Sequence, residues 1–159
     1  MDIPLIYIKD KQAFTKKEGI LKLLGNPVDI AKRLKDEGYK LLHIVDLDAL
    51  RGLSKNLDVY DNLTYFINVQ VECAPDEDLV KKLLTLRCRV VLPPDSDISV
   101  YEEKNLLVAK IPEGYRGPVS DFPDVILEDQ SAIAKFPAKR VMVYEKAEEK
   151  VWGTIISSF

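Results

Sequence analysis

The sequence predicts an α/β protein with a mainly parallel sheet, and three observations predict this class. Apolar strand-like runs alternate with amphipathic helical segments through residue 92, and short connectors join them, as in parallel sheets with right-handed crossovers. Hydrophobic residues make up 47% and charged residues 31%, which is a globular composition. The length of 159 residues suits one domain, whereas a closed eight-stranded α/β barrel typically needs about 250 residues. We therefore expect a sheet that stops short of a full barrel.

The chain begins with an apolar run at residues 4–8 that predicts a buried strand. A lysine-rich connector follows at residues 11–24. Asn26 is a suitable N-cap and Pro27 a suitable first helical residue, so a helix is expected from Pro27 to the C-terminal cap at Gly38.

The next segments repeat the alternation of strand and helix. Residues 41–47 form a nearly continuous apolar run, typical of a central parallel strand. A weak helical pattern at residues 56–66 precedes a strand at 67–73. Residues 75–86 form a clear amphipathic helix with acids in its first turn, and residues 89–92 form the next strand.

The second part of the chain is less regular. Prolines and glycines mark residues 112–123 as loop. Further elements are expected as strands at 106–111, 125–127, 140–144 and 151–159 and a short helix at 131–136. We interpret 1–159 as one domain with regular βα units at 1–92, an irregular insertion at 93–139 and a terminal strand pair at 140–159.

Charge and composition exclude several classes of function. With 26 acidic and 23 basic residues the net charge is −3, which does not suit nucleic-acid binding. The longest uncharged stretch, residues 62–71, is too short for a membrane span, and the N-terminus does not resemble a signal peptide, so we expect a cytoplasmic protein. Cys73, Cys88 and the single histidine, His43, predict neither a disulfide nor a metal site, and His43 is expected to be buried.

Several segments resemble one known family. The sequence NPVDIAKRLKDEGYKLLHIVDLDA at residues 26–49 resembles the first helix and second strand of the histidine-biosynthesis (β/α)8-barrel family. PLIYIKD at 4–10 is similar to its first strand, INVQVECAPDEDLVKKLL at 67–84 to its third strand and following helix, and RVMVYEKAEEKVWGT at 140–154 to its fifth strand. The resemblance implies a partial barrel of about five mainly parallel strands with flanking helices, in effect half of a TIM barrel.

The resemblance is closest to the ribotide isomerases of that family, which carry out an Amadori-type aldose-to-ketose rearrangement. It implies a catalytic acid at position 7, where this chain has Tyr7, and a second at position 145, where it has Glu145. Asp46 and Asp48 follow a central strand, where α/β sheets place their ligand sites, so they are further catalytic candidates. The alternative for both is a structural role, with one aspartate capping the next turn and the other solvated.

The resemblance also implies a phosphate-binding glycine triplet, which here is Glu72, Cys73 and Ala74, a degenerate substrate-binding loop. A carboxylate repels phosphate, and side chains fill the space that glycine leaves open. The glycine after the fourth strand is replaced by Pro93-Pro94, or by Glu128-Asp129 if residues 125–127 are the fourth strand. We therefore expect a relative that has lost ribotide isomerase activity and serves as a ligand-binding, regulatory or assembly protein. The alternative is an active isomerase or lyase acting on a phosphorylated sugar or ribotide.

The expected partners follow from the same picture. A small phosphorylated or sugar ligand is expected at the strand ends, with no cofactor, no nucleic acid and no membrane. A partial barrel leaves strand edges unpaired, so we expect a homodimer built through those edges or through the irregular segment 93–139. Alternatively, residues 151–159 fold back and seal the sheet within one chain.

Overall fold

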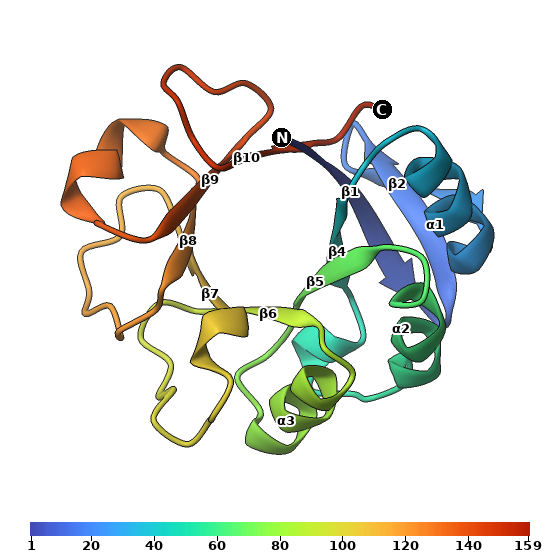
Figure 1. Cartoon of the computed structure of the whole chain (residues 1–159), viewed down its shortest axis with the longest axis horizontal. Coiled ribbons are helices and arrows are strands. Elements are labelled where there is room, and N and C mark those ends of the chain that lie inside the picture. The colour runs from blue at the N-terminus through green and yellow to red at the C-terminus, as the bar shows by residue number, and fades with distance from the viewer.

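The fold is a closed barrel of eight parallel strands, seen in a computed structural model that describes all residues 1–159 (Figure 1). The strand order around the ring is β1-β4-β5-β6-β7-β8-β9-β10, and β10 pairs in parallel with β1 to close it. The strands are β1 (Asp2–Lys9), β4 (Leu41–Asp46), β5 (Asn68–Glu72), β6 (Arg89–Leu92), β7 (Leu107–Ile111), β8 (Asp124–Leu127), β9 (Arg140–Tyr144) and β10 (Gly153–Ile156).

The expectation of a partial barrel with about five strands is therefore wrong, and the short connections explain why. Helices α1 (Pro27–Asp36), α2 (Leu57–Leu63) and α3 (Glu77–Thr85) cover only the side of the barrel from β1 to β6 (Figure 1). The remaining crossovers hold only loops and the short 3-10 segments η2 (Lys104–Leu106) and η3 (Gln130–Lys135). Because four of the seven crossovers lack α-helices, 159 residues suffice to close the ring. The alternative that the C-terminal segment seals the sheet is confirmed by β10.

Loop side chains cover the part of the barrel that has no helices. Ile98, Tyr101 and Phe122 come from loops, are buried, and belong to the same apolar core as the outward-facing Leu107 and Leu127. These side chains exclude water from the outer face of the sheet, as helices do in the first half.

The lysine-rich connector is a β-hairpin that the sequence patterns did not predict. It consists of β2 (Gln12–Lys17) and β3 (Ile20–Gly25). β2 runs antiparallel to the end of β1, and the turn between them places Asp10 and Lys11 at positive φ angles of 47° and 65°, as two-residue hairpin turns require.

The expected homodimer stays a prediction, but the closed barrel removes the open edges on which it rested. β3 remains unpaired on one side of the sheet.

The helix boundaries follow their caps. The Asn26 side chain accepts a hydrogen bond of 2.9 Å from the amide of Val28, and Pro27 is the first helical residue. Asp76 caps α3 in the same way by accepting from the amide of Leu79 at 2.9 Å. None of the helices is long and apolar enough to cross a bilayer.

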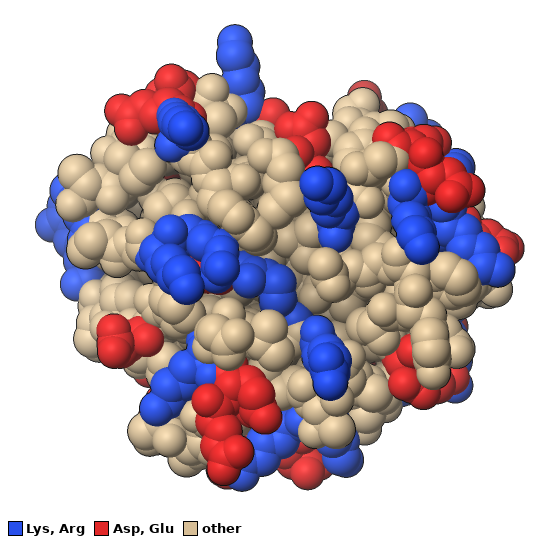
Figure 2. Space-filling view, viewed as in Figure 1, with Lys and Arg blue, Asp and Glu red and all other residues tan.

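An apolar layer across the barrel interior separates two mouths. Seven of the eight strands contribute to it, with Ile3, Leu41, Val91, Val108, Ile126, Met142 and Ile155. β5 instead contributes the buried side chain of Gln70. One mouth lies at the carboxyl ends of the strands, and the other, at their amino ends, faces the viewer in Figures 1 and 2.

Candidate functional site

A cavity of about 410 Å³ opens at the carboxyl ends of the strands, where barrels of this architecture place their ligand sites. Its size suits a small molecule. It is lined by side chains from β1, β4, β5, β7 and β9 and by the residue that follows β8, namely Leu5, Tyr7, His43, Val45, Glu72, Lys110, Tyr144 and Glu128.

The Glu72 carboxylate contacts two other polar side chains of this cavity. Its Oε1 accepts a hydrogen bond of 2.9 Å from Lys110 Nζ, and its Oε2 lies 3.5 Å from His43 Nε2. Burial raises the pKa of Glu72, but the contacts with His43 and Lys110 outweigh it and lower the pKa to about 2. Glu72 is therefore a carboxylate at neutral pH, held between an imidazole and an ammonium group.

The tautomer of His43 follows from its other neighbour. The amide nitrogen of Gln70 lies 2.8 Å from His43 Nδ1, and Arg89 Nε donates to Gln70 Oε1 at 3.2 Å. Since the Gln70 nitrogen can only donate, Nδ1 accepts and the ring proton is on Nε2. That proton faces Glu72, yet His43 Nε2 and Glu72 Oε2 are buried and make no hydrogen bond with each other or with any other group.

The polar contacts continue from the cavity to the opposite mouth. Beyond Gln70, Arg89 Nη2 lies 2.9 Å from Asp124 Oδ2, and Arg140 Nη1 lies 3.5 Å from the same carboxylate. A chain of polar side chains thus crosses the apolar layer along the barrel axis.

The two tyrosines of the cavity stay protonated. Burial and the nearby Glu72 raise the pKa of Tyr7, while Lys110 lowers it in part. Burial also raises the pKa of Tyr144 strongly, with Glu72 and Glu128 adding to the effect. Both phenols therefore keep their protons at neutral pH and can donate hydrogen bonds to a ligand.

Asp46, a predicted catalytic residue, faces away from the cavity. Its Oδ1 accepts hydrogen bonds from the amides of Asp48 (3.0 Å) and Ala49 (2.8 Å) and from Asn56 Nδ2 (3.0 Å), and its Oδ2 accepts from the Tyr60 hydroxyl (2.6 Å). Burial raises its pKa, although these hydrogen bonds oppose the shift. The two amide contacts hold the turn that follows β4, and the contacts with Asn56 and Tyr60 join the end of β4 to α2.

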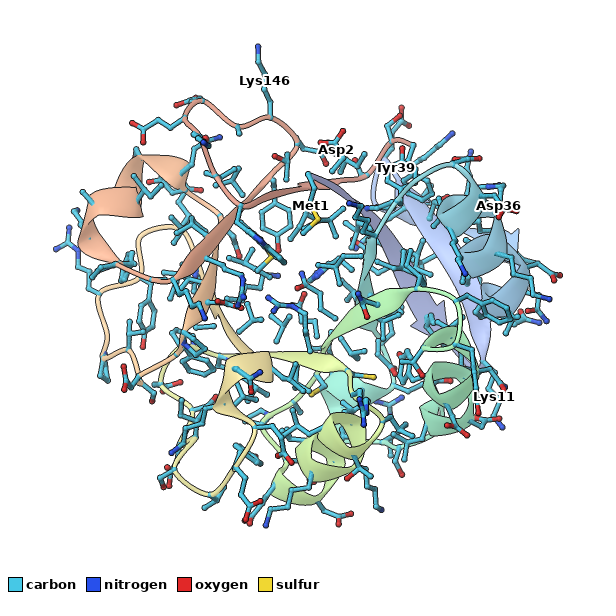
Figure 3. The ribbon with its side chains drawn as sticks, in the orientation of Figure 1. Met1, Asp2, Lys11, Asp36, Tyr39 and Lys146 are labelled. Carbon is cyan, nitrogen blue, oxygen red and sulfur yellow. The ribbon has the colours of Figure 1, made fainter.

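Asp48 secures the hairpin turn. Its Oδ2 accepts from the amide of Asp10 (2.9 Å) and from Asn56 Nδ2 (3.1 Å). Burial raises the pKa of Asp48, but these hydrogen bonds outweigh it and the pKa lies below its ordinary value. Asn56 Oδ1 in turn accepts from the amide of Lys11 (2.9 Å), whose side chain lies beside α2 and pairs with Asp58 (Figure 3).

Glu145 lies outside the cavity. It is exposed, has a φ angle of 63°, and accepts a hydrogen bond from Ser157 Oγ at 2.7 Å. It follows β9, the seventh strand of the barrel, so the expectation that residues 140–144 form the fifth strand is wrong. The fifth strand is β7, and its last inward-facing side chain is Lys110.

The predicted phosphate loop has no free backbone donors. The amide of Cys73 donates to the Val91 carbonyl (3.2 Å) and that of Ala74 donates to the Ala49 carbonyl (3.0 Å). The fourth strand is β6, so the residues that follow it are Pro93 and Pro94, which have no amide proton. Of the three predicted loop residues, only Glu72 contributes to the cavity.

The structure thus brings Tyr7 and Glu72 together and adds four polar residues that the sequence analysis did not assign to a site. These are His43, Lys110, Glu128 and Tyr144. A lysine inside the apolar strand LVAKI is the signal that could have indicated Lys110. No group of three or more His, Cys, Asp or Glu is arranged to hold a metal ion.

Part of this chain is similar to known proteins. A family model described as histidine biosynthesis protein matches residues 3–92. An imidazole-4-carboxamide ribotide isomerase of Methanocaldococcus jannaschii is 37% identical over 91 residues, which cover 53% of this chain and 38% of the relative. The corresponding isomerase of Nautilia profundicola is 31% identical over 121 residues, 70% of this chain and 49% of the relative.

An uncharacterized protein of Methanocaldococcus jannaschii is 27% identical over 122 residues, 67% of this chain and 54% of the relative. The alignments thus cover about half or less of each relative's own length. Because the family model spans more than half of the chain, this protein belongs to the histidine biosynthesis protein family.

Proposed function

We propose that this protein is a family member that does not catalyse ribotide isomerisation and that binds a small hydroxyl-bearing molecule in the cavity of the barrel. The observation that carries the proposal is the pair of buried polar atoms without hydrogen-bond partners, His43 Nε2 and Glu72 Oε2. They lie 3.5 Å apart on the cavity wall. Both atoms are covered by their neighbours, so a ligand hydroxyl fits this pair once a small shift of the Glu72 side chain opens it; the hydroxyl then accepts from the imidazole N–H and donates to the carboxylate.

The energetics favour such a ligand. A buried polar group without a partner costs about 1–3 kcal/mol, so a hydroxyl that satisfies both atoms recovers much of that free energy. The phenols of Tyr7 and Tyr144 supply further donors around the same cavity. Polyhydroxylated molecules such as sugars and polyols have the matching groups.

The charges of the cavity disfavour a phosphorylated ligand. Glu72 and Glu128 are two carboxylates against one ammonium group, Lys110. The amides that would hold a phosphate, those of Cys73 and Ala74, already donate to backbone carbonyls. The named relatives act on a ribotide with two phosphoribosyl groups, and this cavity lacks the anchors that such a substrate needs.

The missing acids disfavour the isomerase reaction itself. A phenol occupies position 7, and Asp46 and Asp48 are engaged in hydrogen bonds outside the cavity. An aldose-to-ketose rearrangement requires an acid and a base that both reach the substrate. We therefore infer that Asp46 and Asp48 are structural residues and that Glu145 has no catalytic role.

The experiment has two arms. In the first, the purified protein is incubated with the ribotide substrate beside the Methanocaldococcus jannaschii isomerase, and we expect no conversion. Turnover that disappears in Tyr7→Phe would contradict the proposal. In the second, thermal unfolding is measured against sugars, polyols and their phosphorylated counterparts.

We expect at least one uncharged polyol or sugar to stabilise the protein more than its phosphate ester does. Glu72→Gln should weaken that ligand by about tenfold, the effect of about 1.4 kcal/mol, because the amide no longer accepts the hydroxyl proton in the same geometry. The matched control Glu145→Gln, at the exposed rim, should bind as wild type does. Equal loss in both variants, or stronger binding of the phosphate esters, would overturn the assignment.

A second candidate function is an isomerase or lyase acting on a sugar. The observation that favours it is Glu128, an exposed carboxylate that forms no salt bridge, is free to act as a base, and lines the same cavity as the Tyr7 phenol. Incubation of the protein with aldoses, with product analysis by NMR, tests this candidate. Turnover that Glu128→Gln abolishes would favour it over simple binding, and the absence of any product would leave the binding role.

A further inference from the structure

The amino-end mouth of the barrel is a second cavity, of about 430 Å³, at the opposite end from the first. Basic side chains gather across the centre of this face (Figure 2). The cavity is lined by Lys40, Arg87, Arg89 and Arg140, together with Asn68, Asn105 and Trp152 and the apolar Met1, Leu41, Val69 and Leu106.

The cations of this cavity are only partly neutralised. Asp124 is fully buried and contacts both Arg89 (2.9 Å) and Arg140 (3.5 Å). Lys40 and Arg87 form no salt bridge. One carboxylate thus faces four cations, although the whole chain carries a net charge of −3. Such a local excess of one sign in a concave site raises the local concentration of oppositely charged ligands.

Arg87 occupies an unusual backbone position. It follows α3 with a φ angle of 65°, in the left-handed region where glycine is the usual residue after a helix. A non-glycine residue is strained in this conformation. The strained position nevertheless carries an arginine, whose side chain lines the mouth.

Trp152 orients two of the guanidinium groups. The guanidinium carbons of Arg89 and Arg140 lie 5.0 Å and 5.5 Å from the centre of its ring. Cation–π stacking of this kind restricts each guanidinium to one plane. A preorganised guanidinium loses less entropy when it forms paired hydrogen bonds to a phosphate.

We propose that the amino-end mouth is a binding site for a small phosphorylated molecule. Arg140 and Arg87 supply the guanidinium forks, Lys40 adds a flexible ammonium group, and Asn68 and Asn105 offer amide donors for the rest of the ligand. The proposal is independent of the cavity at the carboxyl ends of the strands, which has the opposite balance of charge.

The single tryptophan of the chain gives a direct readout, because Trp152 lies in the proposed site. The intact protein is titrated with inorganic phosphate, with ribose 5-phosphate and with ribose while Trp152 fluorescence is followed, and calorimetry provides a second measurement. We expect both phosphate compounds to bind, the affinity to fall as salt is raised, and ribose alone to give no response.

The variant that tests the site is Lys40→Gln/Arg87→Gln. Both residues are exposed and form no salt bridge, so the double variant should fold normally. Its dissociation constant for ribose 5-phosphate should rise by at least about tenfold. The matched control is Lys17→Gln/Lys22→Gln, which removes the same charge from the exposed hairpin and should bind within about twofold of wild type.

Three results would overturn the proposal. The first is no binding of either phosphate compound up to about 50 mM at low salt, which corresponds to less than about 2 kcal/mol. The second is equal weakening in the test and control variants, which would indicate a general charge effect. The third is binding of ribose as strong as that of ribose 5-phosphate.

Discussion

Replacing Asp46 by alanine should destabilise the protein severely and leave the side chains that line the cavity unchanged. The substitution leaves four donors without their acceptor: the amides of Asp48 and Ala49, Asn56 Nδ2 and the Tyr60 hydroxyl. Each orphaned buried donor costs about 1–3 kcal/mol. Asn56 keeps its bond to Asp48 and water can enter the space, so we expect a loss of about 4 kcal/mol in the free energy of unfolding.

Urea unfolding followed by circular dichroism measures this loss, provided that the slope of the transition stays constant. For a chain of this size the midpoint of thermal unfolding should fall by about 8–16 °C. Asp46→Asn keeps an acceptor for three of the donors and should cost no more than about 1.5 kcal/mol. Glu128→Ala, an exposed control at the same end of the barrel, should change stability by less than about 0.5 kcal/mol. A loss below about 1 kcal/mol for Asp46→Ala would refute the structural role of this residue.

Three further perturbations test other parts of the structure. Gly153→Ala should lower the free energy of unfolding by about 1–3 kcal/mol, because the added Cβ would lie 2.5 Å from Ile3 Cδ1. Ile3→Val removes that atom and should recover part of this loss when the double mutant is unfolded. The Glu72 carboxylate has a pKa of about 2 in the folded protein against an ordinary 4.5, so it adds stability above pH 4.5 that is lost as the pH falls toward 2. In urea titrations at decreasing pH, the free energy of unfolding should therefore fall less in Glu72→Gln than in the wild type. Burial raises the pKa of Cys88 to about 12 and raises the pKa of Cys73 further. Iodoacetamide at pH 8 should therefore label neither thiol in the native protein and both thiols after unfolding, and rapid labelling of the native protein would contradict this burial.

The sequence predicted the elements of the fold better than their assembly. Eight strand-like runs were visible in the sequence, and the caps at Asn26 and Gly38 gave α1 its boundaries. The number of strands in the ring was wrong because length was judged against barrels in which a helix covers every strand. Aromatic loop residues such as Tyr101 and Phe122 cover β7 and β8 here, and no periodicity marks residues that pack from irregular loops.

The site was harder to predict than the fold. The family resemblance assigned Tyr7 and Glu72 to the site, and both side chains line the cavity. Alternate residues of a strand point the same way, and Asp46, three residues after the inward-facing His43, therefore points outward. Lys110 reaches Glu72 across β6, and Tyr144 of β9 lines the same cavity, and both placements depend on strand pairing between residues that are distant in sequence.

That closure depends on the pairing of β1 with β10, in which Asp2, Ile3 and Pro4 lie opposite Thr154, Ile155 and Ile156. These strands lie at opposite ends of the chain, so their pairing closes the longest loop in the molecule and carries the largest entropic cost of any strand pair. Pro4 has no amide proton to donate across this seam. Folding should therefore complete the ring late, and local unfolding of the native barrel should begin where β10 separates from β1.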